Sequence, residues 1–374
     1  MKVLIFGDIH LAARYKYGKL LVNGFDSRLL EIVDTLDFIR EYIKENQIDM
    51  VIFLGDLFRT SLPDNEWILN YTVSYFKDIY ESVNNLIMLV GNHDVKNANW
   101  KTFLHIFKAL GDLGNNKLYI LDQPSVINLD DLCILAYPFM LEQSHDFCLK
   151  MLDKKLKKTN CKQLIGIGHI TVAGAVTGVK NFKFTTKNGG IDPNDLAFED
   201  VNYWFLGHIH KHQVLNDKIV YVGSPDYISK SEWNDEKGFI VYDSDVKSYE
   251  FVKTPVRKFK ELELDANKLN KKSLRKAIEK EDADYVYCKI SGEMDNIIKM
   301  KKYIKGFQEL AQKILFVKYD VISVNIKQNE NVEIDALDVK TVLREMLGNY
   351  KETLDSKIYE KLVNAFEEIM KVEE

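Results

Sequence analysis

Six short apolar runs along the chain each end in a glycine that is followed by polar residues. The runs read "VLIFGDIH", "MVIFLGD", "LIMLVGNHD", "LIGIGHIT", "WFLGHIH" and "IVYVGSPD". Short runs rich in β-branched and aromatic residues predict buried strands, and the glycines with polar residues predict loops at the strand ends. Asp, Asn and His therefore gather where buried strands end.

Helical patterns lie between the early runs. The clearest one, over residues 29–43, places six apolar side chains on one face; residues 66–82 and 100–110 also read as helices. The six are Leu29, Ile32, Val33, Leu36, Ile39 and Ile43. Strands alternating with helices predict an α/β fold with a largely buried sheet. In such sheets ligands bind beyond the carboxyl ends of the strands.

The glycine-ended pattern stops near residue 254, which we take as a domain boundary. Residues 1–254 form the first predicted domain, and residues 255–328 mix short strand-like and helical runs, as in a small α+β domain. Residues 329–374 read as a polar linker and two amphipathic helices. Two helices bury little core alone, so they pack either on a partner or on the chain's own body.

Composition indicates an ordinary globular protein. The chain has 374 residues, 46% hydrophobic composition and a formal net charge of -5, so any nucleic-acid contact must use local patches. The four cysteines are scattered without a CxxC pair, which argues against structural zinc and a disulfide framework and favours a reducing compartment. The first apolar run is too short for a signal or membrane segment, so we expect a cytoplasmic protein.

The polar residues at the strand ends form a set of oxygen and nitrogen ligands without thiolates. Such a set suits manganese, iron or zinc. One carboxylate shared by two metals would hold them roughly 3.5–4 Å apart, and two divalent cations outweigh the ligand carboxylates, which leaves a positive site for a phosphate group. The candidate ligands are Asp8, His10, Asp56, Asn92, His169, His208 and His210.

His93, beside Asn92, is the best candidate to protonate a leaving oxygen. Asp94 either orients His93 or caps the loop. Any single motif could equally be a glycine turn with polar caps, but the succession of such motifs at strand ends favours a site. His105 and His145 belong to no cluster, and we expect them to be structural or solvent-facing.

The motifs "GDIH", "GDLF", "GNHD", "GH" and "GHIH", in that order, resemble those of the calcineurin-like metallophosphoesterases. Within this superfamily, the chain resembles the SbcD-type nucleases of DNA double-strand-break repair, which work with an SMC-like coiled-coil ATPase of the SbcC type. The segments "VGSPDYISKSEWNDEKGF" and "PVRKFKELELD" and the tail after residue 330 carry this closer resemblance.

The resemblance implies a two-sheet β-sandwich flanked by helices, a capping domain that contacts DNA, and C-terminal helices that bind the ATPase. It implies two Mn²⁺ ions per subunit, with Mg²⁺ or another divalent metal as substitutes. Asp56 would bridge the two ions. One ion would be bound by Asp8, His10, Asp56 and His210, and the other by Asp56, Asn92, His169 and His208.

The implied activities are 3′ to 5′ exonuclease on duplex DNA and endonuclease on single strands or hairpins. The implied assembly is a homodimer bound to the ATPase through residues 329–374, with no membrane partner, near the nucleoid or, for a phage protein, in the host cytoplasm. His212 follows the complete ligand set, so we expect it to support the site or face the substrate at most.

The chain departs from the family at two loops. Arg59 follows "GDLF" where many members have histidine, and it could hold a substrate phosphate or point to solvent. The loop with Arg14 and Lys16 lacks the glycine that usually follows the leucine of "HL", so its shape could differ from that of the family. We still expect Arg14 and Lys16 to contact DNA. The basic run from Arg257 to Lys276 is either a phosphate track or a solvated face.

Two rival functions fit parts of the sequence. A phosphoesterase for a small phosphodiester such as a cyclic nucleotide would use the same ligands; a phosphoprotein phosphatase is disfavoured because "DRG" is absent after the second motif. A non-catalytic scaffold would use the terminal helices, but no ligand is missing from the set, as would be usual after loss of catalysis.

Overall fold

The computed structural model describes most of the chain outside its C-terminal segment. The described residues are 1–95, 102–111, 117–129, 131–140, 144–177, 182–198, 200–310 and 313–323. One compact unit spans Met1–Val321. The predicted linker and helices at residues 329–374 lie outside the described residues, so their pairing with a partner stays a prediction.

The first sheet has six strands and is mixed. Its order is β12-β11-β1-β2-β3-β4. Strands β1 to β4 are parallel, and β11 runs antiparallel both to β1 and to the edge strand β12. The strands are β1 (Lys2–Phe6), β2 (Met50–Phe53), β3 (Asn85–Leu89), β4 (Leu118–Leu121), β11 (Gly238–Asp243) and β12 (Ser248–Lys253).

The second sheet also has six strands, in the order β5-β6-β7-β8-β10-β9. Its centre is parallel, and the edge strands β5 and β9 are antiparallel to their neighbours. The strands are β5 (Ser125–Leu129), β6 (Leu132–Tyr137), β7 (Leu164–His169), β8 (Val201–Gly207), β9 (Gln213–Asn216) and β10 (Ile219–Tyr221).

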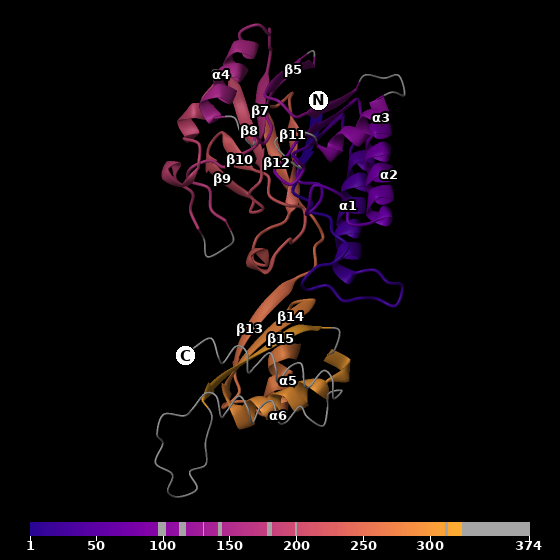
Figure 1. Cartoon of the computed structure of the whole chain (residues 1–374), viewed down its shortest axis with the longest axis vertical. Helices are drawn as coiled ribbons and strands as arrows, with labels where there is room; N and C mark the ends of the chain where they lie inside the picture. The colour runs from indigo at the N-terminus through magenta and orange to yellow at the C-terminus, as the bar shows by residue number, and fades with distance from the viewer. Residues whose placement is uncertain are drawn as a thin grey trace, which may run out of the picture. The chain divides into compact units, whose positions relative to one another are not determined.

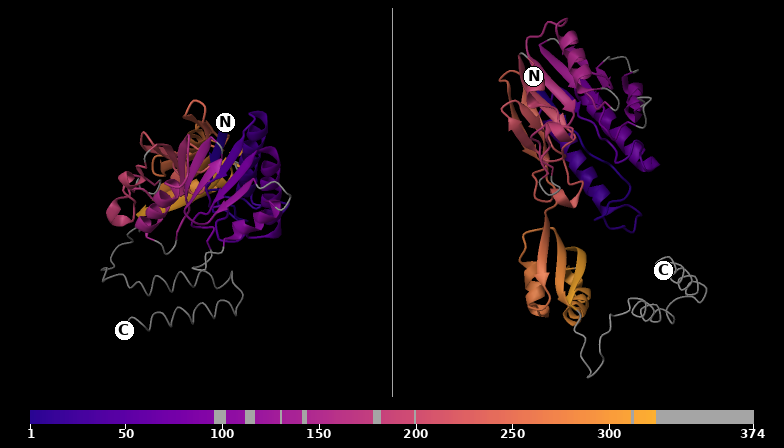
Figure 2. Two further views of the ribbon diagram at one scale, coloured as in Figure 1. Left: turned by 90° about the horizontal axis from the view of Figure 1, so that it is seen from above. Right: turned by 60° about the vertical axis from the view of Figure 1, so that its left-hand side comes forward.

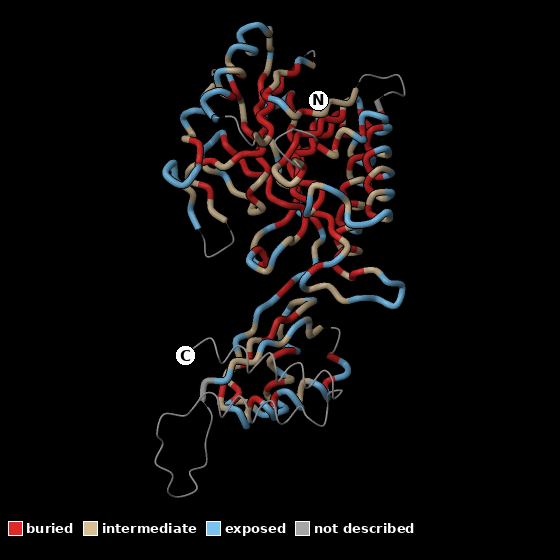
Figure 3. The backbone as a smooth tube through the Cα atoms, viewed as in Figure 1, coloured by how far each residue is buried: buried red, intermediate tan, exposed pale blue. Residues whose placement is uncertain are grey.

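Both faces of the central strands, such as β1, β2, β6 and β7, are buried, which explains why the sequence shows continuous apolar runs. On β1, Val3 and Ile5 enter the core between the two sheets, while Leu4 and Phe6 enter the core beneath the helices. Side chains alternate between faces along a strand, so a strand between two cores must be apolar at every position. Figure 3 shows this buried interior.

Helices cover the outer faces of the two sheets, as Figures 1 and 2 show. Helices α1 (Ser27–Glu45), α2 (Glu66–Ser82) and α3 (Lys108–Gly111) lie on the first sheet, and α4 (His145–Leu156) lies on the second. The predicted sandwich of two sheets between helices is confirmed. Among the described helices, none combines the length and apolar character that a membrane span requires.

The two longer predicted helices form where expected. Asp26 caps α1 by accepting a hydrogen bond from the Arg28 N–H, and Asn65 caps α2 through the Ile68 N–H. The segment predicted as a helix at 100–110 does not form one continuous α-helix. Its described part is a 3₁₀ helix, Phe103–Phe107, followed by the single turn of α3, and the Thr102 side chain caps its start.

A third sheet, in the order β13-β14-β15, follows the sandwich. Its strands are β13 (Phe259–Asp265), β14 (Tyr285–Glu293) and β15 (Ile314–Ser323), and its helices are α5 (Lys271–Glu279) and α6 (Met294–Lys305). The boundary at residue 254 stays a prediction. The remaining 3₁₀ helices are Thr186–Asn188, Pro193–Leu196, Lys230–Glu232 and Gln308–Leu310.

The scattered cysteines argued against a disulfide framework, but Cys133 and Cys161 form one disulfide. Cys133 lies on β6, and Cys161 lies just before the parallel neighbour β7, where the Cys133 N–H donates to the Gln163 carbonyl. The two cysteines are 28 positions apart in the sequence, so their proximity depends on the sheet. The cysteines therefore no longer support the prediction of a reducing compartment. Cys148 and Cys288 are free and buried.

Candidate metal centre

The loops that follow five parallel strands bring the predicted ligands together. Parallel strands of one sheet end at the same edge, so the loops at that edge meet. Asp8 and His10 follow β1, Asp56 follows β2, Asn92 follows β3, His169 ends β7, and His208 and His210 follow β8. Asp8, His10, Asp56 and His169 are buried, while Asn92, His208 and His210 are half-buried.

Four of these residues adopt a backbone conformation that side chains disfavour. The φ angles are 53° at Asp8, 51° at His10, 56° at Asp56 and 82° at His208. Non-glycine residues rarely adopt positive φ, and such strain concentrates at functional sites. The described residues contain three other non-glycine positions of this kind, so the conformation is concentrated at the predicted ligands.

Gly91 and Gly55 explain the glycines of "GNHD" and "GDLF". A Cβ on Gly91 would lie 2.3 Å from Asp56 Oδ1 and 2.8 Å from His169 Cε1. Gly55 has a φ of 95°, and a Cβ there would lie 2.5 Å from the Gly91 nitrogen. Only glycine permits the two loops to approach this closely. The motif glycines therefore allow ligands from β2, β3 and β7 to share one site.

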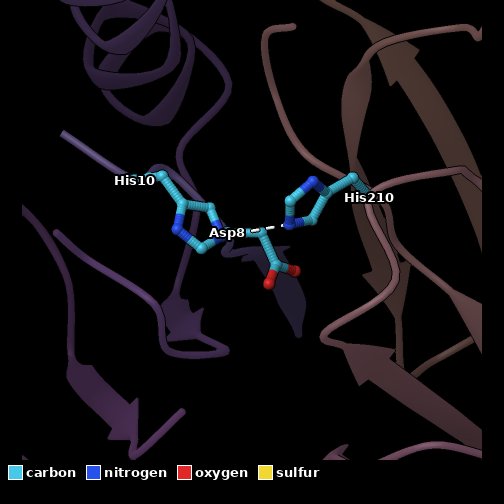
Figure 4. Close-up of side chains that lie close together, drawn as sticks. All are labelled: Asp8, His10 and His210. Carbon is cyan, nitrogen blue, oxygen red and sulfur yellow. Dashed lines mark hydrogen bonds between the residues drawn. The ribbon is translucent and has the colours of Figure 1, made fainter. Parts of the chain in front are cut away.

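One side of the centre is formed by Asp8, His10 and His210 (Figure 4). The Nε2 atoms of the two histidines are 3.0 Å apart, and one ligand atom from each of the three residues lies within 4.8 Å of the others. The Asp8 carboxylate also accepts a hydrogen bond from the His208 N–H at 3.0 Å. This hydrogen bond ties the β1 loop of the first sheet to the β8 loop of the second.

Asn92, His169 and His208 form the other side. Asn92 Oδ1 lies 2.9 Å from His169 Nε2 and 2.8 Å from His208 Nδ1. An amide oxygen and two imidazole nitrogens that converge in this way resemble the ligand shell of a divalent cation.

Asp56 lies between the two sides. Its Oδ2 atom is 3.4 Å from His10 Nε2 and 3.5 Å from His169 Nε2. Its Oδ1 atom accepts a hydrogen bond of 2.8 Å from the His93 N–H. One carboxylate thus faces imidazoles of both groups, which is the arrangement that a bridging ligand requires.

Burial acts strongly on the charges of these ligands. Burial and the neighbouring His210 lower the pKa of His10 to about 3. Burial and the neighbouring His169 lower the pKa of His208 to about 3. Burial also raises the pKa of Asp8 to about 6. Burial opposes the charge of Asp56, but the nearby His169 holds the pKa of that carboxyl below its usual range.

Burial disfavours the charge of His169 and His210, but Asp56 raises the pKa of His169 to about 9 and Glu232 raises the pKa of His210. A cation therefore meets neutral imidazoles at His10 and His208, whereas it competes with a proton at His169 and His210. The oxygen and nitrogen donors of the set fit a divalent metal.

Hydrogen bonds to the outer ring nitrogens orient two of the histidines. His169 Nδ1 donates to the Leu54 carbonyl at 2.7 Å, and His210 Nδ1 donates to Glu232 Oε1 at 3.1 Å. Both rings therefore turn Nε2 toward the centre. Glu232 also pairs with the fully buried Lys237 at 2.6 Å. The sequence alone did not point to Glu232, because no motif spacing connects it with His210.

Replacing Glu232 with glutamine is expected to weaken metal binding about 10- to 100-fold, since outer partners of metal-binding histidines contribute that much. The variant loses the carboxylate that orients His210 and leaves Lys237 without its counter-charge. Titration calorimetry with Mn²⁺ measures the affinity. Glu236→Gln is the matched control, because Glu236 pairs with Lys253 at the surface. Unchanged affinity in Glu232→Gln would contradict this role.

His93 and Asp94 lie at the centre in different ways. His93 is half-buried; its Nδ1 donates to the Arg59 carbonyl at 2.6 Å, and its ring lies 4.7 Å from that of His10. The Asp94 carboxylate accepts hydrogen bonds from the Asp56, Leu57 and Gly91 N–H groups. These bonds fix the loops after β2 and β3, which corresponds to the loop-capping alternative for Asp94.

The three predicted DNA-contacting residues lie in the neighbouring loops. Arg59 packs over the Tyr15 ring at 4.6 Å and donates to the Arg14 carbonyl, while the Arg14 guanidinium donates to the Gly24 carbonyl. Arg59 and the exposed Lys16 line a common cavity. In the run from Arg257 to Lys276, several cations form ion pairs with nearby carboxylates, which favours a solvated face.

The other histidines have distinct environments. His105 pairs with Asp122 at 3.0 Å. His145 lies 2.6 Å from the Tyr137 hydroxyl and lines a cavity of about 310 Å³ together with His169 and His208, so it is closer to the centre than expected. His212 donates from Nδ1 to the Tyr221 carbonyl and stacks on Phe251 with ring centroids 3.9 Å apart. These contacts assign His212 a packing role.

Comparison with known proteins gives consistent results. The family model of calcineurin-like phosphoesterases matches residues 1–212. The chain is 26% identical to the SbcD subunit of the SbcCD nuclease of Staphylococcus epidermidis, over 93% of each protein. It is 25% identical to the protein of the same name from Staphylococcus saprophyticus, over 98% of each. A dimetal phosphatase from Danio rerio shares 10% identity, with a TM-score of 0.41 over 64% of this chain and 91% of that one.

Proposed function

This chain belongs to the calcineurin-like phosphoesterase family, and on that premise we propose that it is a metal-dependent DNA nuclease subunit. The observation that carries the proposal is the convergence of both ligand groups on the Asp56 carboxylate. Relatives that align over nearly the whole chain are named as nuclease subunits, which supports DNA rather than a small phosphodiester as the substrate.

We assign two cations to the centre. Asp8, His10, Asp56 and His210 would hold one, and Asp56, Asn92, His169 and His208 the other, with Mn²⁺ as the proposed metal and Mg²⁺ as a substitute. The close approach of His10 to His210 and of Asn92 to two histidines supports this grouping. When bound, the cations supply Lewis acidity toward a phosphate oxygen and activate the attacking water.

His93 is proposed to protonate the leaving oxygen. The Arg59 carbonyl can only accept, so Nδ1 of His93 carries a proton. The acid role requires a second proton, on Nε2, which the imidazolium would give to the leaving oxygen. Asp94 is proposed as a positioning residue, since it holds the N–H groups of Asp56 and Gly91 rather than the His93 ring. Hydrogen bonds around the centre support both assignments.

The finer activities follow the resemblance to SbcD-type nucleases. We propose 3′ to 5′ exonuclease activity on duplex DNA and endonuclease activity on single strands. We also propose a homodimer, a cytoplasmic location in a cell or phage-infected host, and an SMC-like coiled-coil ATPase of the SbcC type as partner. The names of the relatives, each one subunit of an SbcCD nuclease, support an assembly with a second protein.

An assay on end-labelled duplex, single-stranded and hairpin DNA with Mn²⁺, Mg²⁺ or Zn²⁺ tests this function. We expect Mn²⁺-dependent cleavage, with labelled products that reveal polarity. Hydrolysis of cyclic nucleotides without any cleavage of DNA would contradict the proposal and favour the small-substrate phosphoesterase.

Deletion of residues 330–374 is expected to abolish association with the coiled-coil ATPase while Mn²⁺-dependent cleavage of short DNA persists. The reason is that all proposed ligands lie between Asp8 and His210, in the unit Met1–Val321. Co-purification with the ATPase and the end-label assay measure the two properties. Loss of folding in the shortened chain would show instead that these residues belong to its own core.

A further inference from the structure

The cavity next to the proposed metal centre has the chemistry of a nucleobase site. We infer that this cavity, called the aromatic pocket below, stacks an unpaired base of the strand being cleaved; the inference rests on the proposed nuclease function. The pocket measures about 450 Å³ and is lined by Tyr15, Tyr17, Trp233, Phe259 and basic side chains. Ligand pockets in proteins commonly begin at about 300 Å³.

The aromatic rings of the pocket hold one another in place. Trp233 stacks on Phe259 with ring centroids 4.8 Å apart and an interplanar angle of 15°. Tyr17 meets Trp233 edge-on at 5.2 Å, and Tyr227 meets Phe259 edge-on at 5.6 Å. Trp233 and Phe259 are buried, while Tyr17 and Tyr227 are half-buried. Rings already fixed by packing lose little freedom when a planar ligand stacks on them.

The charge of the pocket suits a phosphate-linked ligand. Among the described residues, those that line it include Lys16, Arg59 and Lys230 but no carboxylate. Lys230 lies 3.9 Å above the Tyr287 ring and pairs with Glu261, a carboxylate outside the lining. Aromatic faces interleaved with cations are the combination that binds single-stranded nucleic acid.

Two hydrogen bonds connect residues that line the pocket with residues of the proposed metal centre. The Tyr15 hydroxyl donates to the His10 carbonyl at 3.0 Å. Arg59, which lines the pocket, accepts a hydrogen bond at its carbonyl from His93. These contacts support the inference that a nucleotide next to the phosphodiester at the centre enters the pocket.

This placement favours an unpaired strand. In a duplex, bases are stacked and paired, and they reach a protein pocket only after leaving the stack. Stacking on aromatic rings tolerates any base because every base has a π-face. The pocket is thus expected to favour single-stranded ends over paired ones without sequence preference.

Binding of short single strands to the full chain in a chelator tests the inference. The probes are a tetrathymidylate, the same tetramer with one 2-aminopurine, and a four-unit abasic backbone of equal charge. We expect quenching of 2-aminopurine fluorescence and an abasic backbone that binds about 5- to 150-fold more weakly than tetrathymidylate, since one stacked base contributes that much. Equal affinity for tetrathymidylate and for the abasic backbone would overturn the inference.

Variants locate the effect. Tyr17→Leu is expected to reduce tetrathymidylate affinity to that of the abasic backbone and to abolish the quenching, without changing abasic binding. Phe147→Leu, at an exposed ring on α4 outside the pocket, should change neither. If circular dichroism shows that Tyr17→Leu is unfolded, Tyr227→Leu provides the same test. Full retention of base-dependent binding in a folded pocket variant would refute the assignment.

The proposed function is tested separately in the same samples. If Mn²⁺ supports cleavage of longer DNA but tetrathymidylate and the abasic backbone bind with equal affinity, the nuclease proposal stands and the pocket proposal fails. If no DNA is cleaved under any metal, the nuclease proposal fails, and the base-dependent binding still decides what the pocket recognises.

Discussion

Replacing Asp56 with asparagine is expected to remove the coupling between the two cation sites and to reduce DNA cleavage on the order of 10³-fold or more. Asp56 Oδ2 faces both His10 and His169, so its charge serves both groups. Metal catalysis contributes several kcal/mol, and each 1.4 kcal/mol is tenfold in rate. Metal content after gel filtration and turnover on end-labelled DNA measure the effect.

Asp122→Asn is the matched control for this variant. Asp122 also pairs with an imidazole, that of His105, but this pair is one-third exposed and separate from the predicted ligands. The control should retain both cations and full turnover. Asp56→Asn with normal metal content and normal turnover would exclude Asp56 as the shared ligand.

Replacing His93 with leucine is expected to lower turnover about 10²- to 10⁴-fold, the usual contribution of a general acid, while both cations remain bound. The His93 side chain bonds to the Arg59 carbonyl and belongs to neither set of proposed ligands. Turnover under saturating Mn²⁺, measured beside calorimetric metal binding, separates the two properties.

His212→Ala provides the comparison for His93→Leu. His212 lies on the loop of the proposed ligands His208 and His210, but its ring stacks on Phe251. We expect this variant to keep both cations and near-normal turnover. Unchanged turnover in His93→Leu would remove the acid role, and loss of metal in that variant would assign His93 to the ligands.

The apolar runs predicted an α/β fold with a largely buried sheet because the central strands are buried on both faces, whereas the sandwich of two sheets was implied by the family resemblance. That burial requires unbroken apolar runs such as Val3 to Phe6, and the runs mark the strands directly. The loops that end these strands carry the polar residues, so the candidate ligands were also visible. The strand order that brings β1, β2, β3, β7 and β8 to one site was supplied by the structure.

Contacts between distant loops could not be predicted in the same way. Glu232 reaches His210 from a 3₁₀ turn 22 residues further along the chain, and His145 reaches the centre from the start of α4. The disulfide between Cys133 and Cys161 depends on two neighbouring parallel strands. Each contact requires the folded sheet, whereas local periodicity reports only which face of an element is buried.

We propose that two cations would share Asp56 and support DNA cleavage at this centre. The most direct measurement titrates the metal-free chain with Mn²⁺ and follows bound equivalents and cleavage of an end-labelled single strand in the same samples. We predict two equivalents per chain, with cleavage that rises as the second equivalent binds. Full cleavage at one equivalent, or no cleavage of DNA at two, would contradict the account.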